Sequence, residues 1–203
     1  MLVIAHRGAS AELPENTLPA FERAIEEGAD FIELDVHADH QGRLVVTHDP
    51  PRDGAGYPTL EEALDLCRGR IGVMIELKRP SRYRRFDVVR RAVELAGQDD
   101  ALVCFQRAAL VEARALRKGL RTVQHVRLGV SIEDAAGAWA AGFRNDRVTP
   151  RGLERARRLG LLTTVFTVND DRRLLELAAL GVDGVFTDLP RRARQLLARR
   201  PSG

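Results

Sequence analysis

The sequence is poor in cysteine and in aromatic residues, and it contains no long hydrophobic run. The two cysteines, Cys67 and Cys104, stand far apart in apolar surroundings, which excludes a disulfide framework and predicts two buried free thiols. No apolar stretch approaches the length of a membrane span. No basic and apolar export signal precedes the first apolar run. We therefore expect a cytoplasmic protein without stable membrane association.

Lysine is also scarce, because Lys78 and Lys118 are the only two and arginine supplies the other permanent positive charges. Arginines crowd at 79–91, 144–158 and 191–200, which raises the alternative of a nucleic-acid-binding protein. No aromatic side chains alternate with these arginines to stack on bases, and the net charge is only +3. We therefore expect solvated helix faces and no nucleic-acid partner.

What the sequence does contain is typical of one globular domain. Its 203 residues are 44% hydrophobic and 30% charged, which is enough for a sizeable core. No linker or change in composition divides residues 1–203, so we expect a single domain. Short apolar, β-branched runs alternate with helical patterns, which predicts βα units and a parallel sheet. About eight such units fit a small closed (β/α)8 TIM barrel better than an open sheet.

Nine candidate strands compete for the eight places in such a barrel. Phe143–Asp146 is the weakest candidate and the one that could instead be a loop. No helical pattern separates Phe31–Val36 from Leu44–Thr47, so we expect an irregular barrel there. The remaining strands are expected at Leu2–Ala5, Val73–Leu77, Leu102–Phe105, Thr122–Val126, Leu162–Val168 and Asp183–Phe186. Helices are expected at Thr17–Glu27, Thr59–Leu66, Val88–Ala96, Ala108–Lys118, Ile132–Ala141, Thr149–Leu159, Asp171–Leu180 and from Pro190 onward.

Three carboxylates stand near the ends of predicted strands. Glu33 and Asp35 lie two residues apart on one strand, so both side chains point to the same face. Glu76 stands near the end of another strand. Acidic groups that lie together repel unless a cation lies between them, and hard carboxylate oxygens suit Mg²⁺ or Ca²⁺. The three are therefore candidate metal ligands. The alternative, solvated acids that point outward, fits poorly with their apolar neighbours.

Two histidines stand at strand ends beside these carboxylates. His6 ends the first strand, and His48 ends the strand expected at Leu44–Thr47. An imidazole gains and loses a proton near neutral pH, so the pair suits a general acid and a general base, in either order. The other histidines have weaker claims: His37 and His40 are expected on the surface and His125 in the core.

Two cations flank the same strand ends. Arg7 and Lys78 can each hold a phosphate oxygen and spread the charge that builds up in phosphoryl transfer. The alternative is an ion pair with Glu33 or Glu76. An ion pair and a phosphate contact can hold at once. Glu15 and Asn16 fall in the loop after the first strand. They could reach the site, or they could only fix this loop and cap the following helix. We favour the second, supporting role.

At these residues the chain resembles the glycerophosphodiester phosphodiesterase family. The resemblance runs in order over nearly the whole chain, and its N-terminal motifs are highly specific together. The matching motifs are His6-Arg7-Gly8-Ala9, Pro14-Glu15-Asn16-Thr17, Ile32-Glu33-Leu34-Asp35-Val36, Leu44-Val45-Val46-Thr47-His48-Asp49, Pro58-Thr59-Leu60-Glu61-Glu62, Ile75-Glu76-Leu77-Lys78, Phe166-Thr167-Val168-Asn169 and Gly181-Val182-Asp183-Gly184-Val185-Phe186-Thr187-Asp188.

The resemblance implies an irregular (β/α)8 barrel that hydrolyses a small-molecule glycerophosphodiester to glycerol 3-phosphate and an alcohol. It implies His6 and His48 as the acid–base pair, Glu33, Asp35 and Glu76 as ligands of Mg²⁺ or Ca²⁺, and Arg7 and Lys78 as phosphate contacts. The attacking group would be water or a neighbouring hydroxyl of the substrate, the latter through a cyclic phosphate. The sequence fixes neither the choice of metal nor an oligomeric state.

The chain departs from the family pattern at two places. Family members usually carry a longer, partly polar insertion after the second histidine, and only Pro50–Pro58 stands there. That insertion helps to cover the substrate, so a more open site is expected. Phe166 stands where the family often has tryptophan, which leaves an apolar wall without an N–H donor. Two alternatives remain: a related barrel phosphodiesterase for phospholipid or other diesters, and a non-catalytic phosphate-binding barrel.

Overall fold

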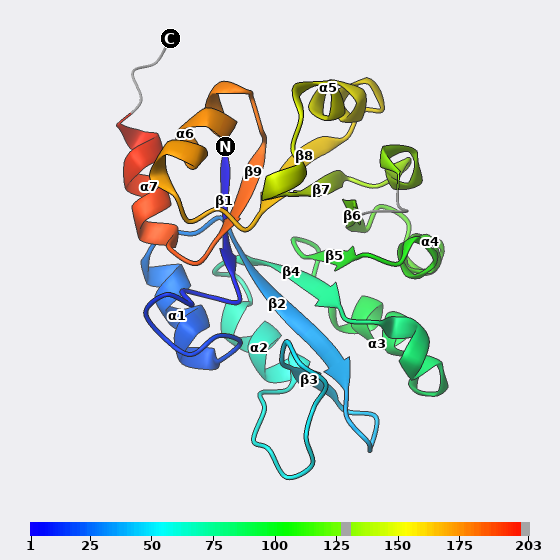
Figure 1. The fold of residues 1–203 in the computed structure, drawn as a ribbon. Coiled ribbons are helices and arrows are strands. Elements are labelled where there is room, and N and C mark those ends of the chain that lie inside the picture. Colours follow the sequence, from blue (N-terminus) through cyan, green and yellow to red (C-terminus); the bar gives the residue numbers. More distant parts are fainter. Residues whose placement is uncertain (127–130, 200–203) are drawn as a thin grey trace.

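The computed structural model describes residues 1–126 and 131–199. Parallel strands close into an eight-stranded barrel, which confirms the predicted fold class (Figure 1). Strand β1 pairs with β2 on one side and with β9 on the other, so strands from opposite ends of the chain close the barrel. In chain order the barrel strands are β1 (Leu2–His6), β2 (Phe31–Ala38), β4 (Gly72–Leu77), β5 (Ala101–Cys104), β6 (Arg121–Val126), β7 (Ala140–Arg144), β8 (Leu162–Phe166) and β9 (Gly184–Thr187).

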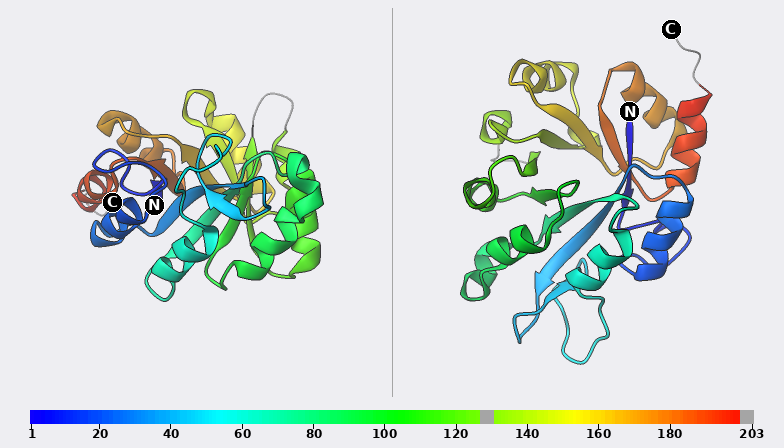
Figure 2. Two further views of the ribbon diagram at one scale, coloured as in Figure 1. Left: turned by 90° about the horizontal axis from the view of Figure 1, so that it is seen from below. Right: turned by 180° about the vertical axis from the view of Figure 1, so that it is seen from behind.

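Helices surround the barrel (Figure 2). Each turns an apolar face toward the strands. The α-helices are α1 (Leu18–Glu26), α2 (Leu60–Cys67), α3 (Val88–Leu95), α4 (Arg107–Leu116), α5 (Pro150–Arg158), α6 (Asp171–Ala179) and α7 (Pro190–Ala198). The 3₁₀ helices are η1 (Pro80–Phe86), η2 (Ile132–Ala135) and η3 (Asn145–Arg147). Within the described ranges, no helix combines the length and the apolar composition that crossing a bilayer requires.

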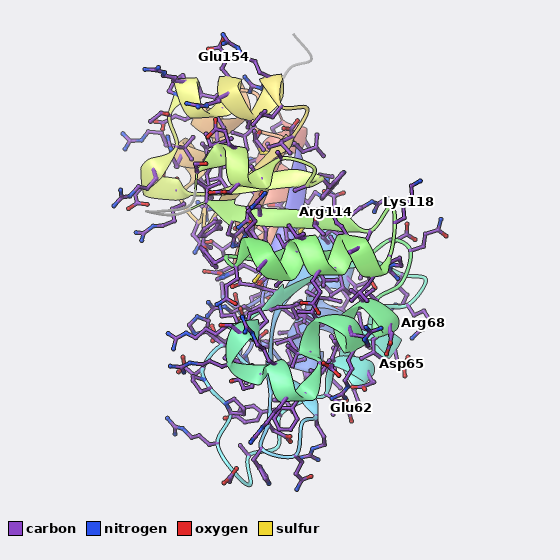
Figure 3. All side chains as sticks on the ribbon, turned by 90° about the vertical axis from the view of Figure 1, so that its right-hand side faces the viewer. Glu62, Asp65, Arg68, Arg114, Lys118 and Glu154 are labelled. Carbon is purple, nitrogen blue, oxygen red and sulfur yellow. The ribbon has the colours of Figure 1, made fainter. Side chains whose placement is uncertain are left out.

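The outer faces of the helices are charged, as the sequence predicts. Glu62, Asp65 and Arg68 of the α2 region and Glu154 of α5 are exposed on one side of the molecule (Figure 3). Asp65 pairs with Arg68 at 2.8 Å, and such exposed pairs contribute little to stability. Arg200, the last residue of the C-terminal arginine run, lies outside the described residues.

Strand β3 (Leu44–Val46) is the one described strand that lies outside the eight-stranded barrel. It pairs antiparallel with the end of β2, where Ala38 lies opposite Leu44. The two strands form a hairpin, which explains why no helix separates them and confirms the predicted irregularity. Residues 47–59, which connect β3 to α2, form the cyan loop that extends below the barrel in Figure 1.

The sequence prediction was wrong around β7. A helix was expected over Ile132–Ala141 and a loop was allowed at Phe143–Asp146, but Ala140–Arg144 is a full barrel strand between β6 and β8. The helical segment η2 ends at Ala135, and the chain turns at Gly137, whose φ is +80°. Alanine and glycine have little preference for strands, so the two neighbouring strands, and not the local sequence, place β7 in the sheet.

Apolar side chains fill both the space between helices and strands and the inside of the barrel. One cluster inside the barrel joins Ile4, Met74, Val103, Val123 and Phe186, which are all fully or almost fully buried. A filled interior leaves chemistry only at the barrel ends, and in this fold the carboxyl-terminal ends of the strands carry it. The loops that follow β1, β2 and β4 leave from that end.

Candidate active site

Three buried carboxylates meet at the carboxyl-terminal ends of β2 and β4. In the parallel register Asp35 lies beside Glu76, and Glu33 lies beside His6 of β1. Only 1% of Glu33, 1% of Asp35 and 7% of Glu76 is exposed. One oxygen of each carboxylate lies within 4.8 Å of the others. The structure therefore brings together the three acids that the sequence singles out.

Two cations partly neutralise this acidic cluster. Lys78 Nζ lies 3.0 Å from both Asp35 Oδ1 and Glu76 Oε1, and Arg7 Nε lies 3.0 Å from Asp35 Oδ2. Burial raises the pKa of Asp35, but the charges of Lys78 and Arg7 outweigh burial, and the resulting pKa lies below its ordinary value. The expected ion pair with Glu33 or Glu76 is therefore present for Lys78, which pairs with Glu76. It is absent for the Arg7 side chain, which pairs with Asp35 and Glu15.

Glu33 lies where burial and neighbouring charges strongly disfavour an ionised carboxylate. Burial, followed by the negative charges of Asp35 and Glu76, raises the pKa of Glu33 well above its ordinary value. Its Oε2 accepts a hydrogen bond from the backbone N–H of Arg7 at 3.1 Å. Its buried Oε1 has no hydrogen-bond partner in the part of the chain that the structure describes. An all-oxygen cluster with an orphaned, buried oxygen fits a hard divalent cation such as Mg²⁺ or Ca²⁺.

The loop after β1 has a strained backbone and places Asn16 against the carboxylate cluster. Arg7 and Asn16 have φ values of 60° and 58°, a region that side chains other than glycine rarely adopt. Gly8 follows with φ +86°, and a Cβ there would lie 2.7 Å from the backbone carbon of Ala20. Asn16 donates to Asp35 Oδ2 at 3.0 Å and accepts from Asp35 N at 3.1 Å. Asn16 therefore orients Asp35.

Glu15, which precedes Asn16 in this loop, contacts the site only through Arg7. Glu15 is half exposed and pairs with Arg7 Nη1 at 2.8 Å. Thr17, and not Glu15 or Asn16, caps α1 by accepting a hydrogen bond from Ala20 N. The expectation that this loop pair caps the helix was therefore wrong, although both residues do contact the site.

His6 is firmly oriented by a carboxylate from the opposite end of the chain. Its Nδ1 lies 2.7 Å from Asp188 Oδ1, and an ionised carboxylate can only accept, so the proton resides on Nδ1. Ser10 and Asn169 also donate to Asp188. Burial raises the pKa of Asp188, but hydrogen bonds from His6 and Asn169 outweigh burial and hold it below its ordinary value. The free Nε2 of His6 is therefore available as an acceptor.

His48 is more open and more loosely held. Its side chain is 40% exposed, and its Nδ1 lies 3.1 Å from the exposed Asp49. It lines a cavity of about 440 Å³ that also reaches Glu76 and Lys78. One histidine is thus fixed by a partly buried carboxylate, and the other faces the open cavity.

Of the two histidines expected on the surface, only one is exposed. His40 is exposed, as expected, but the prediction that His37 lies on the surface was wrong, because only 3% of His37 is exposed. Strand β2 continues to Ala38 to pair with β3, so His37 lies within the sheet. Its ring nitrogens contact Tyr83 Oη at 2.8 Å and the carbonyl oxygen of His48 at 3.1 Å. His37 therefore supports the backbone of His48.

His125 lies in the core, as expected. Its ring stacks on Phe166 with centroids 4.2 Å apart and meets Phe105 and Phe186 edge to face. Burial lowers the pKa of His125 to about 3, so the ring is neutral at physiological pH. Phe166 is thus part of an aromatic cluster inside the barrel, consistent with the apolar wall expected of it.

Sequence reasoning missed two residues that this structure brings to the site. Asp188 and its donor Asn169 lie in two of the family motifs, but the sequence alone predicts no role for either. The available signal was a carboxylate directly after the last strand, because strand ends carry the polar groups of such a barrel. The contact with His6 spans 182 positions, and no local pattern predicts a contact over that distance.

A known protein family matches most of the chain. The sequence pattern of the glycerophosphoryl diester phosphodiesterase family matches residues 6–68 and 51–192. The chain belongs to this family and is a phosphoric diester hydrolase. The two matched segments overlap across residues 51–68, which include part of the short connection after the second histidine.

Named relatives cover almost the whole chain. A putative glycerophosphodiester phosphodiesterase from Bacillus subtilis is 29% identical over 234 residues, covering 94% of this chain and 95% of the relative. That alignment is longer than this chain of 203 residues, so parts of the relative have no counterpart here. A glycerophosphodiester phosphodiesterase from the same organism is 29% identical over 94% of this chain and 84% of the relative.

Solved structures share the fold closely. An Oleispira antarctica phosphodiesterase in complex with the product sn-glycerol-3-phosphate has a TM-score of 0.86 and 25% identity, covering 98% of this chain and 97% of that one. A glycerophosphodiester phosphodiesterase from Parabacteroides distasonis has a TM-score of 0.85 and 25% identity, with the same coverage.

Proposed function

We propose that this chain is a metal-dependent phosphodiesterase that hydrolyses glycerophosphodiesters to glycerol 3-phosphate and an alcohol. The observation that carries the proposal is the buried cluster of Glu33, Asp35 and Glu76, with ligand oxygens within 4.8 Å, at the catalytic end of the barrel. The product bound to the Oleispira antarctica phosphodiesterase supports a small-molecule substrate of this class. We also keep the expectations of a cytoplasmic protein without a nucleic-acid partner.

The same three carboxylates would hold Mg²⁺ or Ca²⁺. When bound, the ion supplies positive charge that polarises the phosphate and stabilises the charge that develops on its oxygens. Arg7 and Lys78, which now contact Asp35, offer further N–H donors at the same place. A bound phosphate would share these donors with the carboxylates, since a guanidinium has five N–H groups and an ammonium three.

The two histidines divide the proton transfers. With its Nδ1 proton directed at Asp188, His6 accepts a proton at Nε2 and activates the nucleophile, because the carboxylate fixes the tautomer and stabilises the imidazolium. His48 lines the cavity, and its imidazolium protonates the oxygen of the departing alcohol. Each group then returns to its starting protonation state through solvent.

Two nucleophiles fit this arrangement. A water molecule would give glycerol 3-phosphate directly, whereas the neighbouring hydroxyl of the glycerol would first give a cyclic phosphate that water then opens. A rapid-quench time course in ¹⁸O-labelled water separates the routes. A cyclic product that forms and decays supports attack by the hydroxyl, and its absence at all times supports attack by water.

The test of the proposed function is hydrolysis of glycerophosphocholine and of bis(p-nitrophenyl) phosphate, with Mg²⁺, with Ca²⁺ and with EDTA. Wild type is compared with His48→Ala and with the matched control His40→Ala, which removes an exposed histidine. We expect metal-dependent release of glycerol 3-phosphate that His48→Ala loses and His40→Ala retains. Cleavage of the synthetic diester alone would indicate another diester substrate. No turnover by folded protein with bound metal would indicate a non-catalytic phosphate-binding barrel.

A further inference from the structure

The cavity beside His48 connects the candidate metal centre with the segment that follows β4. Glu76 and Lys78 line it from the carboxylate cluster, and Arg79 and Arg82 line it from the η1 region. Three cations thus face a cavity of about 440 Å³. Hydrolysis of the scissile phosphate does not by itself require the two arginines.

Both arginines are exposed, and neither forms an ion pair with an acid in the ranges that the structure describes. The acids that line the cavity are engaged elsewhere: Glu76 Oε1 lies 3.0 Å from Lys78, and Asp49 lies 3.1 Å from His48. Neither acid forms an ion pair with Arg79 or Arg82 within the described ranges, so both guanidiniums can contact an anionic ligand.

Arginines on other faces of the molecule are placed differently. Arg70 forms a double contact with Glu22, and Arg192 forms one with Asp171. Each of these bidentate pairs occupies two N–H donors of the guanidinium. The two arginines at the cavity keep these donors available.

The backbone that carries the two arginines is fixed. Arg79 is in the left-handed region, with φ 49° and ψ 50°, and its carbonyl oxygen accepts a hydrogen bond from Arg82 N at 2.9 Å. Gln106 braces the turn, since it donates to Ser81 Oγ at 3.0 Å and accepts from Ser81 N at 3.2 Å. Pro80 between them is buried. A fixed turn lowers the entropic cost of placing both guanidiniums on one ligand.

We propose that Arg79 and Arg82 form a subsite for a phosphate group carried by the leaving alcohol. Preferred substrates are then glycerophosphodiesters whose alcohol bears an additional phosphomonoester. This inference rests on the proposed function, in which His48 protonates the leaving oxygen, so the alcohol departs into the cavity that His48 lines. A phosphomonoester carries close to two negative charges and three acceptor oxygens, which match two guanidiniums.

The test compares two substrates that differ by one phosphate: glycerophosphoinositol and glycerophosphoinositol 4-phosphate. We expect wild type to show a kcat/KM on the order of tenfold higher for the phosphorylated substrate at low salt. The preference should fall as salt rises, because both side chains are exposed and are screened. Equal kcat/KM values for the two substrates in wild type would overturn the proposal.

Variants assign the preference to these residues. The double variant Arg79→Gln/Arg82→Gln should bring the ratio of the two kcat/KM values close to one. The matched control Arg84→Gln/Arg90→Gln removes two exposed arginines from the same stretch of chain that do not line this cavity, and it should keep the wild-type ratio. An unchanged ratio in the first variant, or a lost ratio in the control, would overturn the assignment.

A binding measurement separates failure of this subsite from failure of the proposed function. If wild type hydrolyses neither substrate, the proposed function fails, and both compounds are then titrated calorimetrically. Tighter binding of the phosphorylated compound that is lost in Arg79→Gln/Arg82→Gln would still support the subsite. Equal binding of both compounds would overturn it.

Discussion

Asp188 Oδ1 lies 2.7 Å from His6 Nδ1, so the residue after β9 orients the histidine at the end of β1. Asn169 holds the second oxygen of the same carboxylate, and Ser10 donates to the first. The chain of contacts fixes which ring nitrogen of His6 faces the site. It also ties the proposed base to the closure of the barrel.

Replacing Asp188 with asparagine should lower kcat by about 10²- to 10⁴-fold. The amide can donate to Nδ1 of His6 and thereby stabilise the tautomer in which Nε2 carries the proton and no longer accepts one. Steady-state kinetics with glycerophosphocholine, together with a thermal melt, check this expectation. Asp65→Asn, an exposed change on α2, is the control. A full kcat in Asp188→Asn would contradict the role of His6 Nε2 as the acceptor.

Glu33→Gln should abolish the stabilisation of the fold by Mg²⁺ or Ca²⁺ without destabilising the metal-free protein. Burial and the charges of Asp35 and Glu76 already disfavour the ionised form of Glu33, so a neutral amide removes repulsion but also a ligand. Thermal melts with EDTA and with each metal measure both effects. The exposed change Glu61→Gln should keep the metal-induced rise in Tm. A variant at Glu33 that still shows this rise would argue against the metal site.

The two cysteines should resist thiol reagents in the native protein. Burial raises the pKa of Cys67 and that of Cys104 to about 12, so at a pH of roughly 8 almost no thiolate is present. Ellman's reagent should react slowly with native protein and promptly with both thiols in guanidinium chloride. Rapid reaction of either thiol in the native state would show that the packing around it opens readily.

His125 should make the fold less stable as the pH falls. Burial lowers its pKa to about 3, while an unfolded chain has a histidine pKa of about 6.5. Between these two pH values only the unfolded state binds a proton at His125. The contribution of the neutral ring to the free energy of unfolding is therefore fully present above pH ~6.5 and is lost as the pH falls toward ~3.

Removing this histidine should flatten the pH dependence of stability. Between pH 7 and roughly pH 4, the free energy of unfolding should fall by about 2 to 4 kcal/mol more in wild type than in His125→Asn. Urea melts across this range measure the difference, and His40→Asn serves as the exposed control. Identical slopes in wild type and His125→Asn would contradict a neutral, buried ring.

The barrel and the carboxylate cluster could be predicted because both follow from short-range patterns. Alternating strands and helices imply parallel pairing, and the two-residue spacing of Glu33 and Asp35 sets their common face. The buried positions of Cys67 and Cys104 follow in the same way from apolar neighbours. Each of these inferences needs only the residues within one or two elements.

The remaining features depend on contacts between distant segments. Strand β7 consists largely of small residues and is a strand because β6 and β8 lie on both sides of it. His37 is buried because β3 extends the end of β2. The unpaired state of Arg79 and Arg82 depends on which acids reach them. A single sequence gives no periodic signal for any of these.

Closure of the barrel by β1 and β9 has a consequence during synthesis on the ribosome. A nascent chain that has emerged only as far as β4 already contains Glu33, Asp35 and Glu76, but it lacks Asp188. Until the ribosome has released the segment around residue 188, His6 has no carboxylate to orient it. A prematurely terminated product would therefore carry all three acidic residues and lack the carboxylate that orients His6.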